Sequence, residues 1–91
     1  MRVRWTGKAL SDLARLHDFL APVNPQAAAR TTRLLSTAPA RLRVHPRIGE
    51  KLEEFDPREV RRITVGAYEI RYEVRSEDVV VLRVWHTRED R

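Results

Sequence analysis

Residues 68–75 alternate strictly between apolar and charged side chains. The apolar set is Tyr68, Ile70, Tyr72 and Val74, and the charged set is Glu69, Arg71, Glu73 and Arg75. A period of two is typical of a strand with one buried and one exposed face. Residues 79–85 are nearly all apolar, which predicts a strand that is covered on both faces near the middle of a sheet. Residues 59–65 also alternate and predict a third strand.

Short segments that favour tight turns separate these three strands. Gly66-Ala67 joins the strand of residues 59–65 to that of residues 68–75. Ser76-Glu77-Asp78 joins the latter to the strand of residues 79–85. Glycine and small polar residues are the usual residues of antiparallel hairpin turns. The last third of the chain therefore predicts an antiparallel meander.

A short strand and an amphipathic helix open the chain. Residues 2–5 alternate between polar and apolar side chains and predict the strand. Thr6 can cap the helix that we expect over residues 7–21, where apolar residues recur at helical spacing. Asp12 and Arg15 fall on or near the side opposite the apolar stripe. We expect both to face solvent.

A second helix is predicted to begin at Asn24-Pro25, because asparagine caps helices and proline is tolerated at the first helical position. Its apolar stripe extends to Leu42, but Pro39 should kink or split it. The two helices are joined by few residues and should form an antiparallel hairpin. Residues 45–57 read as an irregular loop, which Phe55 would anchor to the core.

These elements predict an α+β fold in one domain spanning residues 1–91. The order is strand, helix, helix, strand, strand, strand, with the helical hairpin packed on a mainly antiparallel four-stranded sheet. The first strand should lie beside the last, buried one. We expect Trp5 and Trp85 to be core residues and the charged face of residues 69–75 to stay open.

The composition is that of a globular protein, with 42% hydrophobic and 34% charged residues. No apolar run approaches the length of a membrane span, the N-terminus lacks the apolar centre of a secretory signal, and cysteine is absent. These features predict a cytoplasmic protein without membrane contact. The three histidines have no ligand spacing and no phosphate-binding glycine loop occurs, so we expect neither a metal nor a cofactor.

The chain is basic, with a formal net charge of +5, and every cation except Lys8 and Lys51 is arginine. The guanidinium group binds carboxylates and phosphates through two hydrogen bonds, which favours an anionic partner. An arginine-rich codon usage would give the same bias. Charge alone does not choose between an acidic protein and a nucleic acid.

An ordered set of motifs resembles the ParE/RelE superfamily of bacterial type II toxins. The motifs are Trp5-Thr6, Asp12-Leu13, Asn24-Pro25 with Ala27-Ala28-Ala29, His45-Pro46-Arg47-Ile48-Gly49, Arg58-Glu59-Val60, the strand Tyr68 to Val74, and Val84-Trp85-His86-Thr87-Arg88. The resemblance implies the α+β fold expected above. It also implies a cognate antitoxin that forms a hetero-oligomer with the toxin, and Leu10 and Phe19 are candidates for lining its groove.

The superfamily has two activities of different classes. ParE-like members poison DNA gyrase by binding it, whereas RelE-like members cleave messenger RNA on the ribosome. A metal-independent ribonuclease needs an acid, a base and several cations close together. The resemblance implies that Arg71 occupies the position at which RelE-like enzymes carry a phosphate-stabilising arginine. His86 lies near the position at which some of those enzymes carry a catalytic histidine. Arg83 and Arg88 are further candidates for catalytic residues.

Four features of the resemblance favour the gyrase-directed branch. The chain lacks the lysine cluster of many RelE-like nucleases, and its last residues, Thr87 to Arg91, contain no aromatic residue that could stack on an RNA base. The closing motif Trp85 to Arg88 and the motif Asn24-Pro25-x-Ala-Ala resemble those of ParE-like members. The candidates for contact with the target are then Arg61, Arg71, Arg83, His86 and Arg88. Plainer interpretations stay open, since His86 can bond to backbone and Arg71 can join a solvated charge ladder with Glu69 and Glu73. A non-toxic binding module of the same fold is a third hypothesis.

Overall fold

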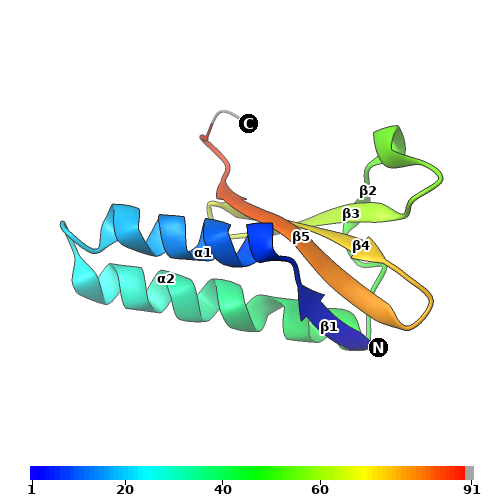
Figure 1. Cartoon of the computed structure of the whole chain (residues 1–91), viewed down its shortest axis with the longest axis horizontal. Helices are drawn as coiled ribbons and strands as arrows, with labels where there is room; N and C mark the ends of the chain where they lie inside the picture. The colour runs from blue at the N-terminus through cyan, green and yellow to red at the C-terminus, as the bar shows by residue number, and fades with distance from the viewer. Residues whose placement is uncertain (90–91) are drawn as a thin grey trace.

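The computed structural model describes residues 1–89 and consists of a helical hairpin packed against a twisted sheet (Figure 1). Within those residues the elements are β1 (Arg2–Trp5), α1 (Gly7–Leu20), α2 (Pro25–Thr37), the 3-10 helix η1 (Ala38–Arg43), β2 (Glu50–Lys51), the 3-10 helix η2 (Glu53–Phe55), β3 (Val60–Val65), β4 (Tyr68–Val74) and β5 (Asp78–His86). The predicted α+β class is confirmed.

The sheet formed by residues 1–89 has five strands in the order β1-β5-β4-β3-β2. β1 is parallel to β5 and the other neighbours are antiparallel. The expected meander and the place of the first strand beside the last are confirmed. The expected number of four strands is one too low, because β2 has only Glu50 and Lys51 and is too short for a period of two to show.

Side-chain caps begin both helices. The Thr6 hydroxyl accepts a hydrogen bond from the amide of Ala9, and the Asn24 side chain accepts one from the amide of Ala27, each at 3.0 Å. α2 ends at Thr37 and continues as the 3-10 helix η1, which contains Pro39. The predicted split of this helix at proline is confirmed.

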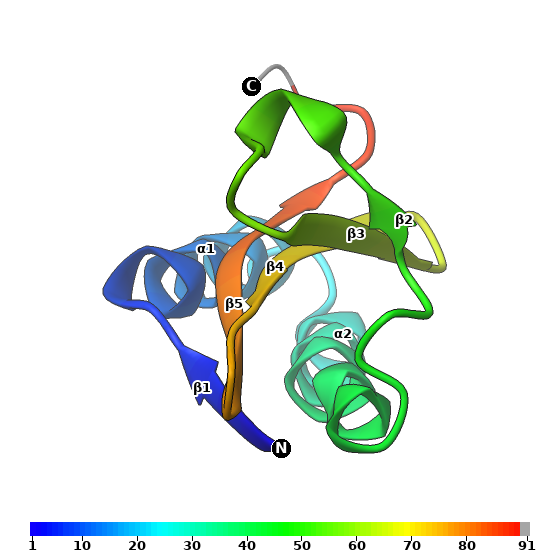
Figure 2. The same cartoon turned by 90° about the vertical axis from the view of Figure 1, so that its right-hand side faces the viewer.

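The core lies between the hairpin and one face of the sheet, and η2 lies beyond the opposite face (Figure 2). The buried apolar side chains are Ala9, Leu16, Leu35, Leu42, Ile63, Ile70, Tyr72, Val74, Val79, Val81 and Val84. Trp5 packs against this cluster, as expected. Trp85 is buried too, but on the side of the sheet away from the helices, as its register opposite Glu69 requires.

Tyr72 fastens the segment between η1 and β2 to the core. Its hydroxyl donates to the carbonyl of Pro46 at 2.8 Å and accepts from the amide of Gly49 at 3.0 Å. A Cβ at Gly49 would lie 2.5 Å from that hydroxyl and 2.6 Å from the carbonyl oxygen of Arg62. Glycine is therefore required here for close approach of the backbone.

The charged face of β4 is not open, contrary to expectation. Glu69 and Glu73 are 4% and 7% exposed, because aromatic and arginine side chains cover them. Phe55 belongs to this cover and contacts Arg71 rather than the apolar core. Periodicity identified the two faces correctly but carried no information about what lies on the second one.

Candidate functional site

The outer edge of β5 has two different partners along its length. β1 pairs with it from Asp78 to Val81 and then ends. Beyond that point side chains bond the strand edge from Leu82 to His86, which we call the β5 edge. The bonds are Thr6 Oγ1 to the Leu82 carbonyl at 2.9 Å, the Val84 amide to Asp12 at 2.9 Å, Arg15 to the Val84 carbonyl at 3.4 Å, and the His86 amide to Glu89 at 2.7 Å.

Asp12 is the buried centre of this arrangement, at 4% exposure. Arg83 donates to both of its oxygens at 2.7 and 3.0 Å, and Arg15 donates at 3.3 Å. Burial alone would raise the pKa of Asp12, but the hydrogen bonds from Arg83, Val84 and Arg15 outweigh it and hold the pKa below its ordinary value. The carboxylate thus ties α1 to β5 in its charged form.

A layer of arginines covers the face of the sheet away from the helices. Arg71 and Arg83 lie opposite each other in the register of β4 and β5. The guanidinium carbons of Arg71 and Arg83 lie 4.8 and 5.3 Å from the ring centroid of Trp85, and that of Arg71 is also 5.3 Å from Phe55. These are cation–π distances. We call Arg58, Arg62, Arg71, Arg75 and Arg83 the arginine layer.

Each arginine of the layer already has a carboxylate partner, although three carboxylates are shared among the five arginines. The pairs are Arg62 and Arg71 with Glu69, Arg58 and Arg75 with Glu73, and Arg83 with Asp12. The hydrogen bond from Arg58 is the main cause that holds the pKa of Glu73 below its ordinary value, against the effect of burial. A phosphate would have to compete with these buried carboxylates for every guanidinium in the layer.

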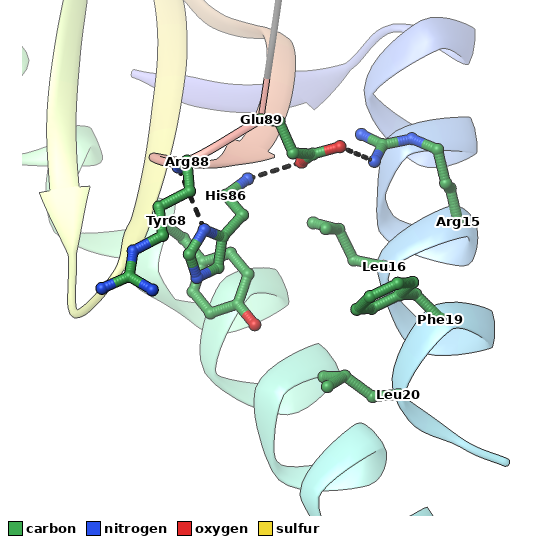
Figure 3. A pocket seen from close by; sticks show the side chains of 8 residues that line it. All are labelled: Arg15, Leu16, Phe19, Leu20, Tyr68, His86, Arg88 and Glu89. Carbon is green, nitrogen blue, oxygen red and sulfur yellow. Dashed lines mark hydrogen bonds and ion pairs between the residues drawn. The ribbon is translucent and has the colours of Figure 1, made fainter. Parts of the chain in front are cut away.

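A cavity of about 600 Å³ opens on the other face, between the C-terminal half of α1 and the end of β5 (Figure 3). Its lining residues are Arg15, Leu16, Phe19, Leu20, Tyr68, His86, Arg88 and Glu89. We call it the α1–β5 pocket. The rings of Tyr68 and His86 meet edge to face, with centroids 5.2 Å apart. Phe19 stands at its mouth with 80% of its surface exposed.

The predicted site residues separate into two groups. Arg71 and Arg83 come together in the arginine layer, whereas His86 and Arg88 line the α1–β5 pocket on the helix side. Residues 83 and 86 are three apart in one strand, so alternation sends them to opposite faces. Arg61 is separate from both groups.

Arg61 and His86 each have a local partner. Arg61 donates to Glu59 at 2.8 Å and to the carbonyl of Gly49 at 2.8 Å, on the side of Tyr72. His86 Nδ1 accepts the backbone amide of Arg88 at 3.1 Å, which confirms the plainer interpretation of this histidine.

The two predicted groove residues lie on opposite flanks of α1. Phe19 belongs to the α1–β5 pocket, while Leu10 does not line it and is 54% exposed. Nine residues separate them, which is two and a half helical turns. Of the two residues, Phe19 is the one that lines the α1–β5 pocket.

Sequence reasoning missed Asp12, which was expected on the solvent side of its helix. A usable signal was present, because residue 12 continues the apolar spacing of Ala9, Leu13 and Leu16. An acidic residue in such a stripe needs a buried cation or amide as partner. Arg15 and Glu89 were missed as well, since their role depends on contacts across the whole chain.

Neither a metal centre nor a membrane helix is found in residues 1–89. No group of three or more His, Cys, Asp or Glu side chains in this range could hold a metal ion. Equally, no helix there is long and apolar enough to cross a membrane.

A family model described as the ParE toxin of the type II toxin-antitoxin system, parDE, matches residues 3–91. Over 85 residues the chain is 35% identical to Toxin RelE2 of Caulobacter vibrioides, and the match covers 93% of each protein.

Solved structures share the fold. The chain superposes on one from the chromosomal ParDE TA system of P. aeruginosa with a TM-score of 0.80 and 21% identity, covering 94% of this chain and 95% of that one. It superposes on a chain of the RelBE2 toxin-antitoxin complex of Mycobacterium tuberculosis with a TM-score of 0.60 and 28% identity, covering 93% and 95%.

Proposed function

The chain belongs to the ParE/RelE superfamily of toxins from type II toxin-antitoxin systems, and we propose that it inhibits bacterial growth by poisoning DNA gyrase. In this proposal it is a binding inhibitor that a cognate antitoxin neutralises. The antitoxin forms a hetero-oligomer with the toxin and is encoded beside it.

The separation of the candidate residues onto opposite faces is the observation that carries this proposal. Ribonuclease chemistry needs an acid or base within reach of the cations that stabilise the phosphate. Arg71 and Arg83 lie in the arginine layer, while His86 lies on the helix side and accepts a backbone amide. The arrangement supports a surface that binds rather than a site that cleaves.

The arginine layer is the surface that we propose for the target. It is a rigid surface, because Arg71 is held between Phe55 and Trp85 and paired with Glu69. Arginine and aromatic residues together are enriched at the centres of protein interfaces. The Nε of Arg71 is buried without a hydrogen-bond partner among residues 1–89, so contact with the target would go through the other guanidinium atoms of this layer.

Arg88 and His86 line the α1–β5 pocket on the opposite face, so the proposed target surface does not include them. Arg61 is left out, because its guanidinium group is occupied by Glu59 and Gly49 on the other side of β3.

The antitoxin is proposed to cover α1, with Phe19 and Leu10 as its apolar contacts. The RelBE2 structure is a toxin-antitoxin complex, and the resemblance to it supports a partner of that kind. An exposed phenylalanine beside an apolar cavity is a usual feature of an interface that is uncovered in the free protein.

Ribosome-dependent cleavage of messenger RNA is the second candidate. The observation that favours it is the 35% identity to a protein named Toxin RelE2. In that case Arg71 and Arg83 would hold phosphate together, with His86 and Arg88 as further catalytic candidates.

Brief induction followed by pulse labelling of DNA and of protein tests the proposal. We expect DNA synthesis to stop first, the purified toxin to inhibit gyrase supercoiling, and the product of the adjacent gene to restore growth. Translation that stops first, with messages cut on ribosomes, would establish the second candidate instead. Unaffected growth with folded protein present would identify a non-toxic binding module.

Substitution in the arginine layer tests the proposed surface. Arg71→Gln should weaken supercoiling inhibition about tenfold or more, as loss of a central interface arginine does. The matched control is Arg33→Gln, which removes an exposed charge from α2. Equal effects of the two changes would contradict the proposal that the arginine layer binds the target.

A further inference from the structure

The C-terminal turn places a carboxylate at the mouth of the α1–β5 pocket. Oε1 of Glu89 accepts the backbone amide of His86 at 2.7 Å, and its Oε2 accepts Nη1 of Arg15 (Figure 3). Figure 3 shows these contacts bridging the two walls of the pocket, from β5 to α1. An amide on the strand and a guanidinium on the helix thus form a cradle for one carboxylate.

The cradle is not the only contact of Arg15. Nη2 of Arg15 already donates to Asp12 at 3.3 Å and to the Val84 carbonyl at 3.4 Å. Its Nη1, the atom that meets Glu89, is directed toward the pocket mouth, and the side chain of Glu89 is one third exposed, at 33%. An ion pair so exposed is weak and can be exchanged for another carboxylate at little cost.

Apolar surface lies directly beside the cradle. Leu16, Phe19 and Leu20 form the α1 wall of the pocket, and Tyr68 forms part of the opposite wall. Phe19 is 80% exposed, so a large aromatic surface is in contact with water next to an anion-binding group. A ligand that fits both features carries a bulky apolar side chain with a carboxylate close to it in sequence.

We propose that Glu89 is an internal stand-in for an acidic side chain of the antitoxin. The antitoxin inserts an apolar anchor against Phe19 and places its own carboxylate on Arg15 and the His86 amide, displacing Glu89 from the cradle. This inference rests on the proposed toxin function, and it specifies the chemistry of the partner and a competition built into the free toxin. The net charge of +5 favours an acidic partner in the same way.

Binding of the purified product of the adjacent gene, measured by calorimetry on the intact toxin, tests the competition. Glu89→Gln removes the competing charge, and we expect the antitoxin to bind about two- to fivefold tighter, the equivalent of one exposed ion pair. In an Arg15→Gln background the same change should give no gain, because the cradle is gone. If Glu89 only orders the C-terminal turn, the Glu89→Gln toxin should bind the antitoxin as tightly as the unchanged toxin or more weakly. That result would overturn the proposal.

Phe19→Ser tests the apolar half and should weaken binding about 30-fold or more, as loss of an aromatic anchor does. Its matched control is Val44→Ser, which removes an exposed apolar side chain at the end of η1, outside the pocket and away from α1. We expect the control to stay within about twofold of the unchanged toxin. If both changes weakened antitoxin binding equally, the proposal that the antitoxin binds in the α1–β5 pocket would be overturned.

The failures of the two proposals are distinguishable. If the adjacent gene product does not bind the unchanged toxin, the proposed antitoxin itself is wrong. If it binds but Glu89→Gln and Phe19→Ser leave its affinity unchanged, the toxin assignment stands and only the cradle fails.

Discussion

The outer edge of β5 has hydrogen-bond partners along both halves of the strand, but the partners differ in kind between the halves. From Asp78 to Val81 its outer edge is paired with the backbone of β1. From Leu82 to His86 its outer edge is bonded by side chains of residues in or next to α1 and by Glu89. In both halves the buried backbone groups find partners, as buried peptide groups must. Only the second half depends on which amino acids provide them.

This difference has a consequence for mutation. Val3 and Trp5 also pack against the core, but any residue of β1 other than proline supplies the same amide and carbonyl, so the backbone pairing of the first half tolerates changes of side chain. The β5 edge does not, because the partners of its peptide groups are individual oxygen and nitrogen atoms of Thr6, Asp12, Arg15 and Glu89. The α1–β5 pocket is built at this second, sequence-dependent half.

The largest effect is expected for Asp12→Ala. The change leaves the Val84 amide without its acceptor and Arg83 without its buried partner, and loss of one member of such a group costs about 3 kcal/mol. Urea unfolding should show a correspondingly lower midpoint with an unchanged slope.

Arg4→Ala is the control for Asp12→Ala in the first half of the strand. Arg4 lies opposite Val80 in the parallel pair, and its side chain forms an exposed ion pair with Asp78. The backbone bonds survive this change, so the unfolding midpoint should hardly move at moderate salt. Comparable losses for the two variants would show that the halves of β5 do not differ as described.

A smaller effect is expected for Thr6→Val, which removes two hydrogen bonds of one hydroxyl. The hydroxyl caps α1 through the Ala9 amide and donates to the Leu82 carbonyl, and together these should contribute about 2 kcal/mol. Asn24→Ala removes only a helix cap and should cost about 1 kcal/mol. The difference between the two variants measures the contact with β5.

Thr6→Ser keeps a hydroxyl at this position and should restore most of the stability lost in Thr6→Val. If serine were no better than valine in thermal unfolding, the hydroxyl alone would not be sufficient at this position, because serine keeps the hydroxyl but lacks the methyl group that valine retains.

Most of the fold could be predicted from local patterns. The alternation of residues 68–75, the caps at Thr6 and Asn24, and the split at Pro39 each concern neighbours in sequence, and the structure confirms them. β2 was missed because two residues carry no period. The class of fold and the neighbours of β5 followed from the order of the elements alone.

The candidate site was less accessible to sequence reasoning, because its contacts join distant parts of the chain. Asp12 and Arg83 are paired across 71 residues, and Arg15 and Glu89 across 74. No periodicity links such positions. The separation of Arg83 from His86 was available in principle from strand alternation, whereas the burial of Glu69 under arginines depends on η2 and could not be seen.

The dependence of stability on pH isolates the charge of Asp12. Since its folded pKa is lower than the ordinary value of about 3.9, the ionised carboxylate stabilises the fold above that value, and this contribution is lost as the pH falls through the lower, folded pKa. Asp12→Asn keeps an acceptor for the Val84 amide but has no charge at any pH. The free energies of unfolding of the two proteins should therefore differ at pH 7 and approach each other at an acid pH below the folded pKa of Asp12. Other carboxylates with lowered pKa values, such as Glu73, titrate equally in both proteins and cancel in the difference. A gap that stays constant between these two pH values would mean that the geometry of the Asp12 side chain, and not its charge, holds the second half of β5 to α1.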